Sequence, residues 1–476
     1  MGNCCSWLGP NKASLNRDRP SIYLLESIAA MPEVEEWIDE SGEIVPEIPV
    51  AQQGVSLEFL EWFLHEFNLK MKPQKTCDVV ADIVLDITRK SGSTLGELLI
   101  HEDSRGPATH LASHPWNNNF HHTIDAVVEH CTEWESKTNS KAFVWFDIFA
   151  LNQHKMAAQV YGQDEIKSML LQAVNQTDET IACLYPWNKP VYIERVWCLY
   201  EAHHTLVTTT ANKQSNKLLT KMALKASHVK NRKKLKFILC ADARQGLEAV
   251  FLGGEDTMDE VVSALANFDV KKASAFKIED KKMILEQIES SFGGSSGLNE
   301  SVARSLRVWL LESATEMLEK YRRIYSFNEP KLALLLRNYG RLLGEISDDL
   351  VQTSNAFEEA LSIDRSFLEL AKNGDVGTFR KEELNVAADL HLIGHNYYMR
   401  KEFRKALERF QLAETIYESS DSMEYAVTLT RMGPTYLKLG DSENGIKALR
   451  KAVSIIDSKP DTRQKILRLA EGTFYS

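Results

Sequence analysis

Residues 142–147 are Ala142-Phe143-Val144-Trp145-Phe146-Asp147, a near-continuous apolar run that ends on an acid. Such a run is typical of a strand in a parallel sheet that is covered on both faces. The same reasoning predicts further strands at 108–113, 180–185 and 235–240, and helices at 120–131, 164–174 and 194–206. Because strands and helices alternate, we expect a doubly wound α/β domain with a parallel sheet.

Functional residues of such a sheet are expected at the carboxyl ends of its strands, because the loops diverge there and open a crevice. Ser113 and Trp116 follow the first strand, Asp147 and Phe149 the second, and Trp187 the third. Neither GxGxxG nor GxxxxGK[ST] follows any of these strands. The sequence therefore predicts neither a dinucleotide-binding turn nor a P-loop.

The helix expected after the third of these strands carries Arg195-Val196-Trp197-Cys198-Leu199-Tyr200-Glu201. This segment resembles the W-C-L-x-E signature of Toll/interleukin receptor (TIR) domains, especially the plant-type ones. With Ser113-His114-Pro115-Trp116 and Trp145-Phe146-Asp147-Ile148-Phe149, it resembles the TIR-like domains that protist proteins fuse to repeat modules. The resemblance covers about residues 55–310, although the loop at 116–120 departs from the usual TIR sequence.

The resemblance implies a flavodoxin-like sheet, homotypic contacts that would form a homo-oligomer and, as in NAD-cleaving members, a catalytic glutamate at Glu201. Cleavage of a nicotinamide–ribose bond builds positive charge on the sugar, which a carboxylate in a pocket can stabilise. The rings of Trp116, Phe149 or Trp187 would stack on a base. Two alternatives stay open: Glu201 as a solvent-facing helix acid, and Asp147 as a cap of the following loop rather than a pocket group.

Histidine and cysteine patterns predict no metal site. The pairs His121-His122 and His203-His204 are adjacent, so on a helix their side chains point about 100° apart and do not share one metal ion easily. Seven cysteines without CxxC pairs predict neither a zinc site nor a disulfide framework. NAD is expected as a substrate, and no cofactor is expected.

The last third of the sequence repeats a pattern of small and large residues. Residues 390–413 carry it, residues 432–452 repeat it, and a weaker copy surrounds Gly340 and Phe357. The pattern resembles tetratricopeptide repeats (TPR), in which paired helices interlock. We expect an all-α TPR-like solenoid whose groove holds a protein or peptide partner, with Tyr397, Phe403 and Tyr436 as contact residues; a helical cap without a partner is the alternative. Pro434 predicts a kinked helix or one that begins late.

The chain begins Met1-Gly2-Asn3-Cys4-Cys5-Ser6, which fits the pattern for N-myristoylation of Gly2. A single myristoyl chain binds membranes only marginally, so palmitate on Cys4 and Cys5 would be needed for stable attachment. We therefore predict a lipid-anchored protein on the cytoplasmic face of a membrane. No segment approaches the roughly 20 apolar residues that a membrane span requires.

Together these features divide the sequence into six segments. They are an acylated disordered tether (1–54), a helical lead-in (55–103), a TIR-like α/β domain (104–275), a helical connector (276–325), TPR-like repeats (326–460) and a tail (461–476). A basic run between Lys213 and Lys236 fits either a solvated helix face or a contact with anionic headgroups. The net charge of -11 argues against a nucleic-acid partner.

Two functions follow from the sequence. In the first, a membrane-tethered signalling protein cleaves NAD with its TIR-like domain and binds a protein partner with its repeats. In the second, the same chain is a non-catalytic adaptor or scaffold at the membrane surface. An open crevice around Glu201 favours the enzyme, whereas a Glu201 paired with Arg195 or covered by Trp187 favours the adaptor.

Overall fold

The computed structural model describes residues 49–99, 103–206, 234–253, 269–275, 277–291, 293–324, 329–346, 349–419 and 423–458. The predicted lipidation sites Gly2, Cys4 and Cys5, the first 48 residues, most of the basic run and the tail lie outside these ranges. The chain divides into two compact units: an α/β unit (1–247 and 261–306) and a repeat unit (248–260 and 307–476). Within the described ranges, no helix is both long and apolar enough to cross a membrane.

The α/β unit contains a six-stranded sheet in the order β2-β1-β4-β3-β5-β6. The strands are β1 Gly54–Ser56, β2 Arg105–Gly106, β3 His110–Ser113, β4 Phe143–Trp145, β5 Glu179–Cys183 and β6 Lys234–Ile238. The four strands predicted from apolar runs, β3 to β6, pair in parallel. β1 pairs antiparallel with both β2 and β4, so the sheet is mixed rather than wholly parallel. Because β1 begins at Gly54, the sheet starts where the sequence predicts a tether and a helical lead-in.

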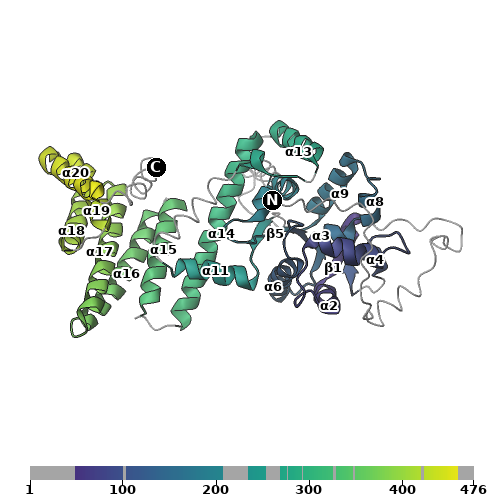
Figure 1. Ribbon diagram of the computed structural model, residues 1–476, viewed down its shortest axis with the longest axis horizontal. Coiled ribbons are helices and arrows are strands. Elements are labelled where there is room, and N and C mark those ends of the chain that lie inside the picture. Colours follow the sequence, from purple (N-terminus) through teal and green to yellow (C-terminus); the bar gives the residue numbers. More distant parts are fainter. Residues whose placement is uncertain are drawn as a thin grey trace, which may run out of the picture. The chain divides into compact units, whose positions relative to one another are not determined.

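Helices cover both faces of this sheet (Figure 1). On one face lie α2 (Leu57–Glu66) and α6 (Phe120–Thr138), and on the other lies α9 (Gln163–Gln176). The alternation along β3 shows the two faces: the His110 ring contacts His130 and Trp134 of α6, whereas Leu111 packs in a cluster with Leu170 of α9. The α/β class predicted from the sequence is therefore confirmed, with helices on both sides.

Shorter elements connect these helices and strands. They are α3 Thr76–Val79, a π-helical turn η3 Val80–Val84, α4 Leu85–Ile87, α5 Leu95–Leu98, α7 Asp147–Ala150, α8 Gln153–Ala157, α11 Ala241–Phe251 and α13 Ile278–Ser290, with 3-10 turns η2 Val50–Gln52, η4 Val191–Glu194 and η5 Val270–Lys272. The helix that carries Glu201 spans residues 196–206. Ser56 caps α2 by accepting a hydrogen bond from the Phe59 backbone N–H. The long helix α14 covers Gly294–Ile324.

The repeat unit holds three helix pairs: α15 Pro330–Ile346 with α16 Leu350–Ala371, α17 Val376–Met399 with α18 Phe403–Tyr417, and α19 Met423–Lys438 with α20 Ser442–Asp457 (Figure 1). In each pair a glycine of the first helix meets a large side chain of the second. A Cβ at Gly340 would lie 2.5 Å from Phe357, one at Gly394 2.7 Å from Phe410, and one at Gly433 2.5 Å from Leu449.

These repeated contacts confirm the TPR-like solenoid, because the same small-into-large packing recurs at the same place in every pair. Buried alanines follow each large residue by one turn, namely Ala360, Ala413 and Ala452. Pro434 lies inside α19, and the helix runs through it from Met423 to Lys438. The late start predicted from this proline is therefore wrong.

Candidate functional site

The site predicted from the sequence lies at the carboxyl end of β3. Ser113 is the last residue of that strand, and Glu201 lies on the helix 196–206, which follows β5 along the chain. The two side chains are buried and are hydrogen-bonded to each other. This position agrees with the rule that ligands of parallel sheets bind beyond the carboxyl ends of the strands.

A chain of hydroxyl groups leads away from Glu201. The Ser113 Oγ lies 3.2 Å from the Tyr192 Oη, and the Tyr192 hydroxyl donates to the backbone oxygen of Cys198 at 3.0 Å. Since each hydroxyl has one proton, all three bonds are made at once only if Glu201 is protonated and donates to Ser113, which then donates to Tyr192. The geometry therefore favours a neutral Glu201.

The electrostatics agree with this proton count. Burial raises the pKa of Glu201 to about 8, with a smaller contribution from the negative charge of Asp147. Burial has this effect because the charged form loses its hydration. Near neutral pH the carboxyl group is then mostly protonated, and it can donate a proton rather than stabilise positive charge.

Asp147, the first residue of α7, lies near this carboxyl group and acts in two ways. Its Oδ2 accepts a hydrogen bond from the Trp116 indole N–H at 2.7 Å, and its Oδ1 accepts one from the Ile148 backbone N–H at 2.8 Å. The second bond attaches the carboxylate to the first turn of α7, whose N-cap residue is Phe146. The first bond fixes the half-buried Trp116 ring beside Asp147.

The other two aromatic residues predicted at the site have structural neighbours. Phe149 is fully buried and packs edge-on against Phe59 and Phe63, so no face of its ring is open for stacking on a base. Trp187 packs against α11, where a Cβ at Gly246 would lie 2.6 Å from the indole nitrogen. Of the three rings predicted to stack on a base, the structure places Trp116 in contact with Asp147, the acid that lies near Glu201.

The remainder of the W-C-L-Y-E segment is structural. Trp197 donates from its indole N–H to the carboxylate of Asp280 on α13 at 3.2 Å. Cys198 and Leu199 are buried in the core, and burial raises the pKa of the Cys198 thiol well above its ordinary value. A thiol held in this state is a poor nucleophile. Arg195 lies near the Ser274 hydroxyl, and neither it nor Trp187 makes a hydrogen bond or ion pair to Glu201 in the described part of the chain.

In the repeat unit, the predicted contact residues are half-buried and already have neighbours. The Tyr397 ring has the Lys405 ammonium and the Arg400 guanidinium each 5.5 Å from its centroid. Phe403 packs edge-on against Tyr398, and the Tyr436 hydroxyl accepts a hydrogen bond from the Gln411 side-chain amide at 3.1 Å. Tyr397 and Phe403 thus make contacts within the pair of α17 and α18, and Tyr436 joins that pair to α19.

A polar cluster on the first helices of the pairs escaped the sequence analysis. His391 and His395 lie one turn apart on α17, and Arg341 on α15 and Arg431 on α19 lie close enough to lower the pKa values of both imidazoles. Burial is the larger cause, and the pKa falls to about 3 for His391 and about 4 for His395. We call these four residues, of which the two arginines carry the positive charge, the cationic cluster. No local sequence pattern could reveal this cluster, because its residues come from three different helices.

Comparisons with known proteins add little to this description. No protein-family model matches the chain, and no curated protein matches it. Solved structures similar to it include BtubC (BKLC) from P. vanneervenii, at 16% identity over 46% of this chain and 77% of that one, with a TM-score of 0.28. MamA is 16% identical over 43% of this chain and 92% of its own, with a TM-score of 0.24. The apo form of RapI is 19% identical over 46% of this chain and 72% of its own, with a TM-score of 0.27. The TPR-like description therefore depends on the glycine contacts of the three helix pairs.

Proposed function

We propose that this chain is a membrane-associated signalling adaptor whose TPR-like repeats bind an acidic segment of a protein partner. The observation that carries the proposal is the state of Arg431 in the cationic cluster. Its guanidinium is half-buried, burial lowers its pKa, and the described residues offer it no ion-pair partner. A buried charge without a counterion is costly, which favours a ligand that supplies one.

The neighbours of Arg431 suit the same ligand. His395 has a buried Nδ1 without a hydrogen-bond partner in the described structure, and the His391 Nδ1 lies 3.0 Å from the Thr428 hydroxyl. Arginine side chains, and imidazoles that present an N–H, bind carboxylate or phosphate oxygens through charge-assisted hydrogen bonds. An acidic peptide would therefore find both charge and donors at the cationic cluster.

The test is direct binding of labelled peptides that are matched in length, one set acidic and one uncharged. We expect the full chain to bind the acidic set, and Arg431→Gln to weaken that binding roughly 10- to 100-fold, the value of one charge-assisted hydrogen bond. The matched control is Arg404→Gln, because Arg404 is exposed on α18. Equal affinity of the two variants, or equal binding of both peptide sets, would contradict the proposal.

Membrane attachment belongs to the same proposal and rests on the sequence of the first six residues. Gly2 would carry myristate, and Cys4 and Cys5 would carry palmitate. Metabolic labelling with a myristate analogue should mark the wild type and miss Gly2→Ala. If the wild type stays unlabelled, the adaptor would bind its partner away from membranes.

NAD cleavage by a TIR-like α/β unit is the second candidate function. It is favoured by the burial and raised pKa of Glu201 at the carboxyl end of β3, since strongly perturbed acids often mark catalytic sites. A carboxylate that stabilises positive charge would have to be ionised, so nicotinamide release should rise as the pH increases through about 8.

The enzyme hypothesis is tested with protein concentrated on liposomes. Nicotinamide release by the wild type that disappears in Glu201→Gln and persists in Glu165→Gln, a change of an exposed acid on α9, would establish catalysis. Absence of turnover in all three proteins, together with intact peptide binding, would leave the adaptor function alone.

A further inference from the structure

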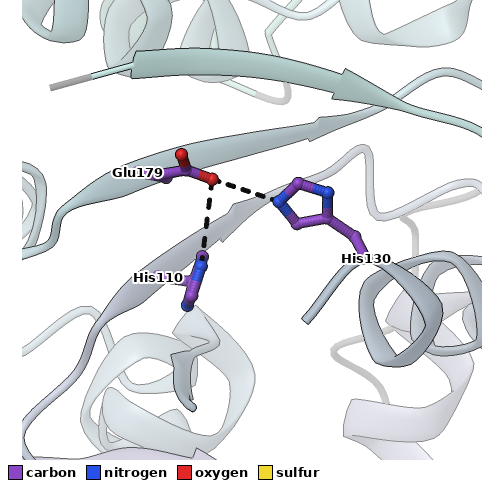
Figure 2. Close-up of side chains that lie close together, drawn as sticks. All are labelled: His110, His130 and Glu179. Atoms are coloured by element: carbon purple, nitrogen blue, oxygen red, sulfur yellow. Dashed lines mark hydrogen bonds and ion pairs between the residues drawn. The ribbon is translucent and has the colours of Figure 1, made fainter. Parts of the chain in front are cut away.

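A second group of polar side chains lies at the opposite end of the strands from Glu201. His110 is the first residue of β3 and Glu179 the first residue of β5, and the two are direct partners in the parallel register. His130 comes from α6, the helix that covers this face. Figure 2 shows both imidazole rings turned toward the carboxylate of Glu179.

The three side chains converge on one point. The Nε2 of His130 lies 3.1 Å and the Nε2 of His110 3.9 Å from the same oxygen, the Oε2 of Glu179. One ligand atom from each residue lies within 4.8 Å of the other two. The His110 side chain is fully buried, that of Glu179 is 9% exposed and that of His130 is 22% exposed.

Hydrogen bonds of the neighbouring residue determine which nitrogen of His110 carries the proton. The Thr109 hydroxyl donates to the backbone oxygen of Phe143 at 3.0 Å and accepts from the Phe143 backbone N–H at 3.0 Å. Its single proton is thereby used, so the His110 Nδ1, 2.8 Å away, must donate to it. The His110 Nε2 is then unprotonated and presents a lone pair toward Glu179.

This lone pair is the unusual feature. The His110 Nε2 is buried and makes no hydrogen bond within the described residues. It faces a carboxylate oxygen, which is also an acceptor, so no proton of these two groups lies between them. The same carboxylate oxygen lies within hydrogen-bonding distance of the His130 Nε2, at 3.1 Å. A cation placed among the three groups would bind the lone pair of His110, and a histidine whose other nitrogen donates to a fixed acceptor is the usual arrangement of a metal ligand.

We propose that His110, His130 and Glu179 bind a divalent transition-metal ion, with Zn²⁺ as the species that this donor set fits. Two imidazoles and one carboxylate are a known zinc ligand set, with a water in the fourth position. Tetrahedral zinc with bonds of about 2.0–2.1 Å separates its ligand atoms by roughly 3.3 Å. The distances of 3.1 Å and 3.9 Å from Glu179 to the two imidazoles lie on either side of that value.

The ion would join β3, β5 and α6 where the strands begin. Because Ser113 and Glu201 lie at the other end of β3, the metal would hold the sheet and helix together and would not take part in chemistry at Glu201. Exposure of His130 provides a path for the ion from solvent. The expected role is therefore stabilisation of the α/β unit by metal binding.

The experiment compares full-length wild type, His130→Ala and His122→Ala after chelator treatment and titration with Zn²⁺ against a competing chromophore. His122 is the matched control because it lies on the same helix, is also half-buried and stacks on Tyr185 rather than on Glu179. We expect wild type and His122→Ala to bind one tight equivalent that is absent from His130→Ala. The loss should exceed the roughly 10- to 100-fold that removal of an outer-shell partner costs.

Two further readouts separate a metal site from a packing role. Co²⁺ should give the visible absorption of a tetrahedral site in wild type and not in His130→Ala. Zn²⁺ should raise the Tm of wild type and leave the Tm of His130→Ala unchanged. If His130→Ala fails to fold, Glu179→Gln, which keeps the size of the side chain, takes its place. Equal Zn²⁺ affinity in the ligand variant and in His122→Ala, or no binding by wild type, would overturn the proposal.

Discussion

In the α/β unit the carboxyl group of Glu201 is buried against the hydroxyls of Ser113 and Tyr192, whereas in the repeat unit Asp364 and Asp389 are buried around the guanidinium of Arg337. The first acid is accommodated by a proton alone, whereas the second pair needs a cation from another helix as well as a proton. The comparison teaches that the α/β unit tolerates its buried acid through protonation, whereas the repeat unit also depends on an intact ionic network.

The network of the repeat unit joins three helices. Arg337 of α15 pairs with Asp364 of α16, and with Asp389 of α17 at 3.2 Å. All three side chains are almost completely buried. Burial raises the pKa of Asp389 well above its ordinary value, and a hydrogen bond joins it to Asp364, so that one proton and one guanidinium serve two carboxyl groups.

Removal of the cation should have the largest effect. Arg337→Met leaves two buried acids without a counterion, and we expect a loss of about 3–5 kcal/mol in the free energy of unfolding. Urea unfolding followed by circular dichroism measures it, with Arg365→Met on the exposed face of α16 as the control. A loss below about 1 kcal/mol would mean that both aspartates take up protons as Glu201 does.

A pH series tests the other side of the comparison. The folded state holds the proton of Glu201 with a pKa of about 8, against an ordinary value of 4.5, so it binds more protons than the unfolded chain between these values. The contribution of this carboxyl group to the free energy of unfolding is therefore fully present below pH 4.5, and it is lost as the pH rises through 8. From pH 6 to pH 9 we expect a loss on the order of 3 kcal/mol in the wild type that is absent from Glu201→Gln. Parallel profiles for the two proteins would refute the assignment.

The difference between the two units also governs what the sequence could predict. Strands β3 to β6 carry apolar runs and were found from them, and the repeats were found because Gly394 and Gly433 recur in the same context. β1 was missed because Gly54-Val55-Ser56 is too short to form a pattern. Local sequence thus predicts elements that repeat or that lie within an extended apolar run.

Sites that need two distant segments were found only in part. Ser113 was identified because strand ends are special positions in parallel sheets, and Glu201 because its segment resembles the W-C-L-x-E signature. Tyr192, which completes their hydrogen-bond chain, lies in a 3-10 turn with no motif of its own. His110 and Glu179 meet through the register of β3 with β5, which no local pattern contains. Side-chain contacts across a sheet depend on that register.

Packing in the repeat unit should be sensitive at its glycines. A Cβ on Gly433 would lie 2.5 Å from the Leu449 side chain, so Gly433→Ala should cost about 1–3 kcal/mol of unfolding free energy by overpacking. The control is Gly344→Ala on α15, where the nearest atom would be 3.7 Å away. This control should gain about 0.5–1 kcal/mol, because alanine favours a helix interior more than glycine does. Destabilisation of both variants to the same extent would show that helix propensity, and not the contact with Leu449, sets the effect.

An exposed ion pair of the α/β unit gives the smallest expected effect and isolates burial as the variable. Arg244 of α11 and Glu129 of α6 form a two-pronged pair, with the Nη2 atom 2.9 Å from the Oε2 atom, and their side chains are 47% and 53% exposed. Water solvates these charges even when the pair is broken, so Arg244→Gln should change the free energy of unfolding by less than about 1 kcal/mol. The same measurement that detects several kcal/mol for Arg337→Met should barely resolve this variant, and added salt should reduce the difference further. If the exposed pair costs as much as the buried network, burial does not explain the sensitivity of the repeats, and the contrast between the two units would have to come from the number of helices that each arginine joins.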